Sequence, residues 1–302
     1  MAKVVVLGGE GMLGHKMFQI LREYFPDVVC TIREGPQHWL RQIDLLGGRD
    51  VVCGVDAACT SGLRNLLGGL APEVVVNCIG IVKQRPEAAS RRVCIRINAL
   101  LPHELAAMTS EWGGRVIHFS TDCVFSGSRG RYTEDDESDA TDVYGRTKFL
   151  GEVADENALT LRTSMIGREL AGRASLLEWF LSQEHARVPG YTRVIYSGVT
   201  TNHLAHLTGW LIQARPRLHG LFQVSSAPLS KYALLCSLKT AYGRDVTIVP
   251  DDGPVCDRSL DGSRFEATAG YRCPAWEALI GELACDKTPY ERWCGYAAAA
   301  YR

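Results

Sequence analysis

Two side chains that can act together in proton transfer, Tyr144 and Lys148, lie four positions apart. On a helix this spacing places both on one face. An ammonium beside a phenol favours the phenolate, so we expect the pKa of Tyr144 to be lowered toward neutrality. Such a phenol can deliver a proton to a carbonyl oxygen while a hydride reaches the carbonyl carbon. Thr121, which ends a strand-like segment in a Ser-Thr-Asp triplet, can hold the same oxygen. We therefore predict Thr121, Tyr144 and Lys148 as a catalytic set.

A glycine-rich run, Gly-Gly-Glu-Gly-Met-Leu-Gly, occupies residues 8–14 after the first strand-like segment. It fits both GxGxxG and GxxGxxG, and it leads from a strand into a helix as a dinucleotide-binding loop must. Such a loop exposes backbone N–H groups and places the positive end of a helix against a pyrophosphate. A tight turn without a ligand is the structural alternative, but the flanking elements favour dinucleotide binding. The predicted contacts in this loop are Gly8, Gly11, Met12, Leu13 and Gly14.

The second strand-like segment ends in Thr31, Ile32 and Arg33. A site that prefers NAD usually has Asp or Glu there to accept hydrogen bonds from the ribose 2′-hydroxyl. A threonine and an arginine would instead favour a 2′-phosphate. We therefore predict NADPH as the cofactor and Arg33 as one of its contacts, with NADH left open as an alternative.

The catalytic set and the glycine loop need elements that position them, and the first half alternates short apolar runs with helical segments. Runs that are apolar almost throughout are typical of parallel strands covered on both faces. This alternation predicts an α/β, Rossmann-type fold with a doubly wound parallel sheet. A long helical segment spans residues 87–110, where Pro102 should break or restart it. The expected strands are residues 3–7, 28–32, 51–55, 74–78 and 116–119, and the other expected helices are residues 12–24 and 57–70.

The second half of the chain is less regular. Strand-like residues 194–196 and 221–224 flank a helical segment at residues 203–214. We predict an NADP-binding Rossmann domain over residues 1–160 and a smaller α/β, mainly substrate-binding region over residues 161–302, with later segments free to return to the first domain. The smaller region should face the strand ends, where such sheets bind ligands.

The composition argues against several classes of protein. A net charge of -1 gives no general surface for nucleic acid or an anionic membrane. No apolar run approaches the ~20 residues that span a bilayer. The N-terminus leads directly into a strand-like segment, so we expect a cytoplasmic protein without a signal peptide. The 11 cysteines contain no Cys-x-x-Cys pair, which argues against a disulfide framework or a zinc site. We therefore expect no metal ion.

Together these motifs resemble the dTDP-4-dehydrorhamnose reductase family of the extended short-chain dehydrogenases. The similarity runs over nearly the whole chain, and its more specific parts are the Ser-Thr-Asp-x-Val-Phe and Leu-Arg-Thr-Ser motifs. The resemblance implies hydride transfer from NADPH to the C4 ketone of a nucleotide-diphosphate-linked 6-deoxy sugar, in deoxysugar or polysaccharide biosynthesis. The matching segments are residues 8–14, 120–127, 144–148, 151–152, 161–164, 220–225 and 259–261, with Trp276.

The resemblance also implies a role for individual positions. Tyr144 would be the general acid, Lys148 its partner and a ribose contact, and Thr121 the hydrogen-bond donor to the carbonyl. Family members often pair as dimers, so a homodimer is one expected assembly. The remaining implied cofactor contacts are Val55 and Asp56 at the adenine, Asn77, Cys78 and Ile79 beside the nicotinamide, and Asn98, which would organise the site from its helix.

Two positions depart from the family pattern: Cys123 replaces a tyrosine and Met165 replaces a tryptophan. Both family positions contact the sugar, so the sugar ring or its stereochemistry should differ here. Cys123 also lies two residues after Thr121, as does a cysteine that acts with a histidine in the related GDP-fucose synthases to epimerise the sugar. Residues 165–184 contain no histidine, which favours a Cys123 that only lines the pocket.

The predicted substrate-binding set combines these positions with guanidinium groups that could hold a diphosphate bidentately. A plain surface position is the alternative for each arginine. The set is Asp122, Cys123, Met165, Arg193 and Arg258.

Three functions compete. The first is a reductase of a 4-keto sugar nucleotide. The second is an epimerase, dehydratase or epimerase-reductase of the same superfamily. The third is a non-catalytic, NADP-binding regulatory subunit, because the regulatory subunit of methionine adenosyltransferase resembles the same reductase family. The intact catalytic set, Thr121, Tyr144 and Lys148, favours an enzyme.

Overall fold

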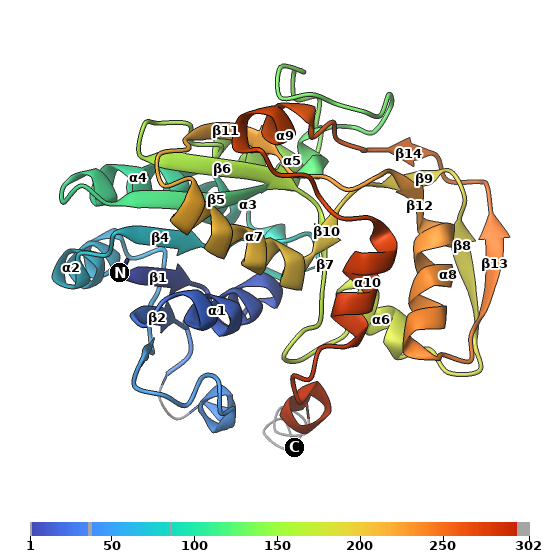
Figure 1. Cartoon of the computed structure of the whole chain (residues 1–302), viewed down its shortest axis with the longest axis horizontal. Helices are drawn as coiled ribbons and strands as arrows, with labels where there is room; N and C mark the ends of the chain where they lie inside the picture. The colour runs from blue at the N-terminus through green and yellow to red at the C-terminus, as the bar shows by residue number, and fades with distance from the viewer. Residues whose placement is uncertain (1, 36–37, 85, 295–302) are drawn as a thin grey trace.

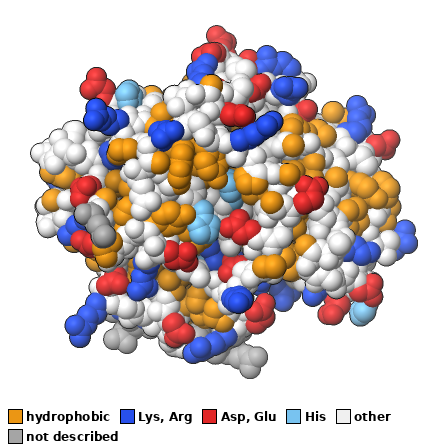
Figure 2. Space-filling model, in the orientation of Figure 1, with side chains coloured by type: hydrophobic (Ala, Val, Ile, Leu, Met, Phe, Trp, Pro, Cys, Tyr) orange, Lys and Arg blue, Asp and Glu red, His pale blue; other side chains and the backbone are white. Residues whose placement is uncertain are grey.

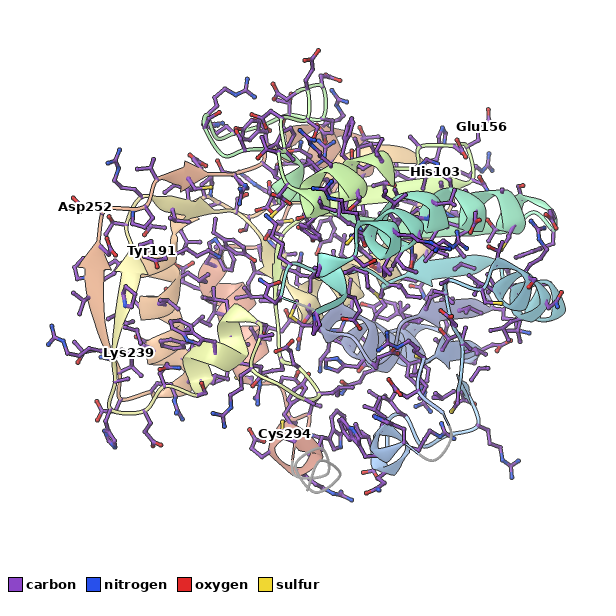
Figure 3. The ribbon with its side chains drawn as sticks, turned by 180° about the vertical axis from the view of Figure 1, so that it is seen from behind. His103, Glu156, Tyr191, Lys239, Asp252 and Cys294 are labelled. Carbon is purple, nitrogen blue, oxygen red and sulfur yellow. The ribbon has the colours of Figure 1, made fainter. Side chains whose placement is uncertain are left out.

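A computed structural model describes residues 2–35, 38–84 and 86–294, so the last eight residues of the predicted second region lie outside the described residues. A helix-covered parallel sheet forms one end of the molecule, and short strands with helices form the other (Figure 1). In the view from behind, His103 and Glu156 lie at the end with the large sheet, whereas Tyr191 and Asp252 lie at the opposite end (Figure 3).

The large sheet has seven strands, and every neighbouring pair is parallel. Their order is β11-β6-β5-β4-β1-β2-β3, so the direction of winding reverses between β1 and β4. The predicted doubly wound parallel sheet is thus confirmed, and sheets of this kind bind ligands at that reversal. The strands are β1 (Val4–Leu7), β2 (Val28–Thr31), β3 (Val51–Val52), β4 (Val74–Asn77), β5 (Arg115–Thr121), β6 (Ala158–Thr163) and β11 (Gly220–Gln223).

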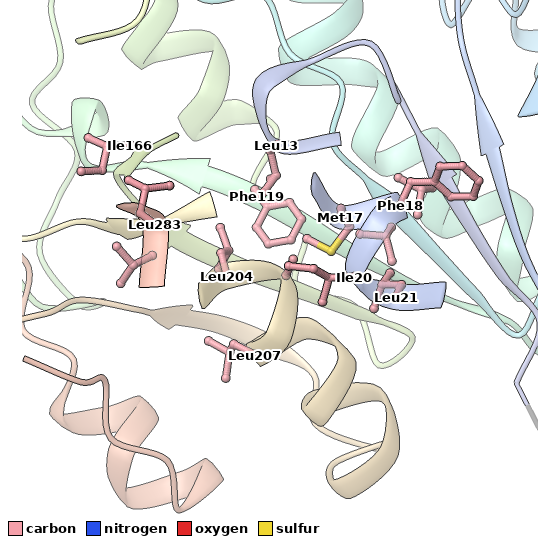
Figure 4. Packing of buried hydrophobic residues seen from close by; sticks show 14 of the residues in the cluster. Leu13, Met17, Phe18, Ile20, Leu21, Phe119, Ile166, Leu204, Leu207 and Leu283 are labelled. Atoms are coloured by element: carbon pink, nitrogen blue, oxygen red, sulfur yellow. The ribbon is translucent and has the colours of Figure 1, made fainter. Parts of the chain in front are cut away.

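Helices cover both faces of this sheet. Helices α1 and α7 pack against each other on one face (Figure 4), and α2 and α4 cover the other. In β1, Val4 and Val6 pack in the core with α1, whereas Val5 and Leu7 pack in the core with α2. Because both faces are buried, the strand is apolar at every position. These helices are α1 (Met12–Tyr24), α2 (Thr60–Leu70), α4 (Leu101–Ser110) and α7 (Thr201–Ala214).

The smaller part is formed by segments that follow β6. Strand β9 pairs with β12 and β14, β8 pairs with β13, and β7 pairs with β10. Its strands are β7 (Met165–Ile166), β8 (Arg187–Tyr191), β9 (Val194–Tyr196), β10 (Val199–Thr200), β12 (Leu229–Ser230), β13 (Thr247–Asp251) and β14 (Cys256–Asp257). Its helices are α6 (Leu176–Leu181), α8 (Lys231–Tyr242) and α10 (Trp276–Ala284), while α9 (Ser263–Ala269) packs against β11. Because α7 and β11 belong to the large layers, the chain returns to them after entering the smaller part.

Three expected elements differ from those observed by more than two residues at an end, or are divided, whereas the bounds of the others agree within two residues. The third strand ends at Val52 rather than residue 55, because the chain turns at Gly54, whose φ is 72°. Helix α2 begins at Thr60 rather than residue 57. The long helix expected at residues 87–110 is divided into η2 (Pro86–Ala89), α3 (Arg91–Cys94), the π-helical η3 (Ile95–Leu100) and α4.

Pro102 explains where that division falls. It occupies the first turn of α4, directly after the π-helical segment η3. Proline has no N–H to donate to the preceding turn, and such a residue is tolerated at the start of a helix. The helix therefore restarts at this point, and the carbonyl group of Asn98 faces Gly151, where a Cβ would come within 1.9 Å of it.

Acidic and basic side chains are interspersed over the face drawn in Figure 2. Within the described ranges, no helix combines the length and apolar character needed to cross a membrane. All 11 cysteines are free. Across the same described residues, no three His, Cys, Asp or Glu side chains gather as metal ligands.

Candidate active site

The glycine loop between β1 and α1 leaves its backbone open to a ligand. Gly8 has a φ of 84°, a conformation that side chains disfavour. A Cβ on Gly14 would come within 2.0 Å of the Gly8 carbonyl oxygen, so the helix can approach the loop only with glycine there. Gly11 is the N-cap of α1, and no side chain caps it in the described structure. The backbone N–H groups at this positive helix end can therefore hold a pyrophosphate.

A cavity of about 380 Å³ lies beside the loop, walled by the segments that follow β1, β2, β3 and β4. The predicted cofactor residues that line it are Gly8, Gly11, Arg33, Val55, Asp56, Cys78 and Ile79. Those outside its lining are Met12, Leu13, Gly14, Asn77, Asn98, Tyr144 and Lys148. Trp39, Leu40 and Leu170 also line the cavity, although their sequence context gave no signal. Glycine-loop donors, a nearby arginine and apolar walls together fit a nicotinamide dinucleotide.

Arg33 lines this cavity and lies near several carboxyl groups. Its guanidinium group lies 3.7 Å from Glu34 and 3.4 Å from Glu87, and its backbone N–H donates to Glu10 over 3.2 Å. Burial raises the pKa of Glu10, although hydrogen bonds to backbone N–H groups act in the opposite direction. The arginine is thus available to an anion only in competition with Glu34 and Glu87.

Thr121 and Tyr144 meet because the start of α5 (Val143–Leu150) packs on the end of β5. The Asp142 carboxylate caps α5 by accepting from the Gly145 N–H over 2.9 Å. A Cβ on Gly145 would come within 2.2 Å of the Cys123 carbonyl oxygen, so this close approach needs glycine. The sequence predicts that Tyr144 and Thr121 act together, and in the folded chain their hydroxyl groups lie at one site.

The expected lowering of the Tyr144 pKa is wrong for this structure. Burial raises the pKa of the Tyr144 phenol, the neighbouring Cys123 adds to that rise, and the Thr121 hydroxyl only partly offsets it. The Lys148 ammonium group is directed to the sheet instead, where its Nζ lies 2.6 Å from the Phe119 carbonyl oxygen. The phenol is therefore protonated at neutral pH, which is the state that a proton donor requires.

Asn98 braces the wall of the cavity against the catalytic helix. Its Oδ1 accepts from the Ile81 N–H over 2.8 Å, and its Nδ2 donates to the Ile81 carbonyl over 2.9 Å. The same Nδ2 lies 3.3 Å from the Thr147 hydroxyl on α5. Asn98 is fully buried, so these contacts use its amide inside the fold rather than at the cavity surface.

The two arginines predicted to bind substrate, Arg258 and Arg193, lie in different surroundings. Arg258 lies beside Cys123, with Nη1 4.0 Å from Sγ and Nε donating to the Phe125 carbonyl over 2.8 Å. In contrast, Arg193 is exposed and makes no side-chain hydrogen bond or ion pair with the described residues. Met165 is half-buried in β7.

Burial favours the neutral forms of the Asp122 carboxyl group and the Cys123 thiol. Burial raises the pKa of Asp122, although Lys231 and Arg258 act in the opposite direction. Burial likewise raises the pKa of Cys123 to about 11, and Asp122 adds to that rise. Lys231, the first residue of α8, lies 4.0 Å above the Tyr196 ring and was not singled out from the sequence. Only the folded chain brings this lysine to the Ser-Thr-Asp segment.

Known proteins similar to this chain include enzymes and a subunit of an enzyme. Methionine adenosyltransferase 2 subunit beta from Mus musculus is 25% identical over 316 residues, covering 95% of this chain and 84% of that protein. The probable low-salt glycan biosynthesis reductase Agl14 of Haloferax volcanii is 29% identical, covering 95% and 94%. A dTDP-4-dehydrorhamnose reductase from Bacillus anthracis, solved in complex with NADP, matches with a TM-score of 0.74 at 18% identity, covering 94% and 98%.

The match to a family model extends over the glycine loop, the Ser-Thr-Asp segment and the Tyr144–Lys148 pair. It covers residues 2–183, and the family is described as the RmlD substrate binding domain. The resemblance inferred from the motifs is thereby confirmed, and the solved structure agrees in fold. This chain belongs to the RmlD substrate binding domain family.

Proposed function

We propose that this protein is an NADPH-dependent reductase of a nucleotide-linked 4-keto-6-deoxy sugar. The observation that carries the proposal is the meeting of the Thr121 and Tyr144 hydroxyl groups at the end of β5, in a fold that also has a dinucleotide-type cavity. A pair of hydroxyl donors at one point suits a carbonyl oxygen that gains negative charge during reduction. Membership in a family that includes sugar-nucleotide reductases supports the choice of substrate class.

In the proposed reaction, bound NADPH supplies a hydride to the ketone carbon. Tyr144 donates its phenolic proton to the ketone oxygen, and the Thr121 hydroxyl donates a hydrogen bond to the same oxygen. The ketone thus becomes an alcohol, with one hydride and one proton gained. Burial keeps Tyr144 protonated before the reaction, so the proton is in place when the hydride arrives.

The choice of NADPH over NADH rests on Arg33. A guanidinium group can hold a 2′-phosphate through two parallel hydrogen bonds. Its present partners are the exposed carboxylates of Glu34 and Glu87, and ion pairs in such positions are weak. A 2′-phosphate could therefore replace either partner at little energetic cost.

The substrate side is proposed around Arg258, Lys231 and Asp122. Arg258 and Lys231 bring two cationic groups near the Cys123 thiol, where a sugar diphosphate needs compensation of its negative charge. Cys123 and Met165 stand where the resembling family has larger aromatic side chains, so a different sugar configuration is proposed.

The test is NADPH oxidation by the purified protein with a panel of dTDP-, UDP- and GDP-linked 4-keto-6-deoxy sugars. We expect rapid oxidation with one nucleotide series. Tyr144→Phe should lower the rate by about a hundredfold or more, because general acid catalysis is lost. Tyr191→Phe, at an exposed position, is the matched control and should leave the rate unchanged. Equal rates in both variants would remove Tyr144 from the mechanism.

A second candidate is a non-catalytic, NADP-binding subunit. It is favoured by the similarity to methionine adenosyltransferase 2 subunit beta along 95% of this chain. Under this proposal NADPH binds but no sugar is reduced, and a partner protein co-purifies at a fixed ratio. Sugar reduction that depends on Tyr144 would decide against it.

A further inference from the structure

The last described segment of the chain, residues 286–294, packs against the walls of the cavity beside the glycine loop, which we call the cofactor cavity. In this segment Tyr290 and Trp293 are 1% and 4% exposed. Both belong to the same hydrophobic core as Trp39 and Leu170, which line the cofactor cavity. The proposed reaction gives this segment no role, and the match to the family model ends before it.

A fully buried histidine of α1, His15, connects this segment to the glycine loop. His15 Nδ1 lies 2.9 Å from the Gly11 carbonyl oxygen, and His15 Nε2 lies 2.9 Å from the Tyr290 hydroxyl. A carbonyl oxygen only accepts, so Nδ1 carries a proton and donates to that oxygen. Burial lowers the pKa of His15 to about 4, so the imidazole is neutral at physiological pH. Its Nε2 therefore accepts a hydrogen bond from the Tyr290 hydroxyl.

The Gly11 carbonyl group is the point at which these contacts reach the ligand-binding backbone. It also accepts from the His15 backbone N–H over 3.2 Å, at the start of α1. This carbonyl and the Met12 N–H belong to one planar peptide unit, so the direction of the carbonyl determines the direction of the N–H. The Met12 N–H lies at the positive end of α1, where the glycine loop can hold a pyrophosphate. A contact at Tyr290 is thereby transmitted to a donor for the pyrophosphate.

Tyr290 also supports a second wall of the cofactor cavity. The Arg168 guanidinium group lies 4.6 Å from the centre of the Tyr290 ring, and its Nε donates to Glu178 over 2.6 Å. Cys294, labelled in Figure 3, has its Sγ 3.7 Å from the Leu170 carbonyl oxygen. Leu170 lines the cofactor cavity. The glycine loop and the segment after β7 are therefore both held by residues 286–294.

We propose that residues 286–294 hold the cofactor site in its binding conformation, with Tyr290 and His15 as positioning residues for the N–H groups that bind the pyrophosphate. The segment must be docked for the glycine loop to bind the cofactor at full affinity. Because such coupling is reciprocal, a bound cofactor must in turn stabilise the docked segment. This inference rests on the cofactor site of the proposed function, and it does not depend on which sugar is reduced.

The first test is Tyr290→Phe, which removes the hydroxyl and keeps the ring beside Arg168. Fluorescence titration should show that the dissociation constants of NADPH and NADH both rise by about three- to tenfold, the effect of one buried hydrogen bond. The two factors should be equal, because both cofactors carry the pyrophosphate. The control is Tyr24→Phe, which removes another tyrosine–histidine contact of α1, over 3.1 Å to His206, away from the cofactor cavity. It should leave both affinities unchanged.

Two outcomes of this titration would overturn the proposal. Unchanged affinities in Tyr290→Phe, with or without a loss of stability, would mean that the segment only stabilises the fold. A loss confined to NADPH would mean that the hydroxyl acts on the 2′-phosphate rather than on the pyrophosphate, which both cofactors share.

Hydrogen exchange measures the reciprocal effect in the unaltered chain. NADPH, or adenosine diphosphate as a probe that has the diphosphate without the nicotinamide, should slow amide exchange in residues 286–294 by twofold or more. Residues 247–251, in β13, are the internal reference and should exchange at the same rate with and without either ligand. In Tyr290→Phe saturated with NADPH, the slowing should be smaller. Equal exchange rates in residues 286–294 with and without NADPH would overturn the coupling.

These tests separate the inference from the reductase proposal. If no sugar is reduced while both binding results are as expected, the reductase proposal fails and the role of residues 286–294 stands. If sugar is reduced while Tyr290→Phe binds both cofactors normally, that role fails and the reductase proposal stands. If the unaltered protein binds neither cofactor, both fail.

Discussion

Arg162 and Glu152 form a bidentate ion pair in which Nε lies 2.9 Å from Oε1 and Nη2 lies 2.6 Å from Oε2. Their side chains are 2% and 6% exposed. Glu152 also accepts from the Ser120 hydroxyl over 2.6 Å. The pair thus joins β6 and the segment after α5 to the residue that precedes Thr121. Two of the sequence motifs, Leu-Arg-Thr-Ser and Gly-Glu, therefore support the active site from the inside of the fold.

Glu152→Gln should destabilise the protein strongly. The substitution leaves the Arg162 guanidinium group buried without its counter-charge, which costs about 3–5 kcal/mol in comparable buried pairs. Urea unfolding measures the change in the free energy of unfolding. Glu156→Gln, at an exposed position nearby, is the control and should change stability by less than about 0.5 kcal/mol. Similar stabilities for the two variants would show that the buried pair contributes little.

The large sheet was predictable because its signals are local. Apolar runs and a glycine loop determine the strands and the first helix, and α1 has the bounds predicted for it. The meeting of Tyr144 with Thr121 was also predictable, since a strand end and a helix start that follow each other in an α/β fold lie at one edge of the sheet.

The surroundings of Lys148 and Lys231 were not predictable, because they depend on contacts between segments that are distant in the sequence. The spacing of Tyr144 and Lys148 shows that they share a helix, but not that Lys148 is drawn to Phe119 and His118 on β5. Lys231 lies close enough to lower the pKa of Asp122 only because α8 packs against β9 and β12, and no local pattern marks that approach. The partners of a buried charged side chain, and whether they raise or lower a pKa, depend on contacts across the whole fold, which local spacing does not describe.

Cys123→Ser should retain most of the proposed reductase activity, within about threefold. Burial raises the pKa of Cys123 to about 11, so the thiolate that proton abstraction requires is scarce at neutral pH. The product formed in deuterium oxide should carry no solvent deuterium on the carbons beside the reduced one. Thr121→Ala is the control that should lose activity, because it removes a donor to the ketone oxygen. Solvent deuterium at those carbons, lost in Cys123→Ser, would instead establish epimerisation.

The ion pair between Lys16 and Asp286 should make stability fall in strong acid. Lys16 Nζ lies 2.6 Å from Asp286 Oδ2, and the two side chains are 2% and 9% exposed. Burial alone would raise the pKa of Asp286, but hydrogen bonds from Lys16 and Thr288 outweigh it and lower that pKa to about 2. A lowered folded-state pKa stabilises the protein above the unfolded value of about 4.

That contribution, about 2 kcal/mol, should be lost as the pH falls from about 4 to about 2. The measurement is the free energy of unfolding in urea across this range. Asp286→Asn should be less stable at neutral pH and should lose less stability on acidification than the unaltered protein. Asp245→Asn, whose side chain is 81% exposed, is the control and should keep the unaltered pH dependence. An unchanged acid response in Asp286→Asn would assign the effect to other carboxylates.

Arg33→Ala should weaken NADPH binding by about tenfold or more and change NADH binding by less than about twofold. Only NADPH carries the 2′-phosphate that a guanidinium group would hold, and one charge-assisted contact is worth about 1.5–3 kcal/mol. Cofactor fluorescence titration measures both affinities without a sugar substrate. Arg22→Ala is the control, since Arg22 is also half-exposed and paired with a carboxylate, Asp50, but does not line the cavity. Equal weakening of both cofactors would mean that Arg33 shapes the cavity wall rather than selecting the phosphate.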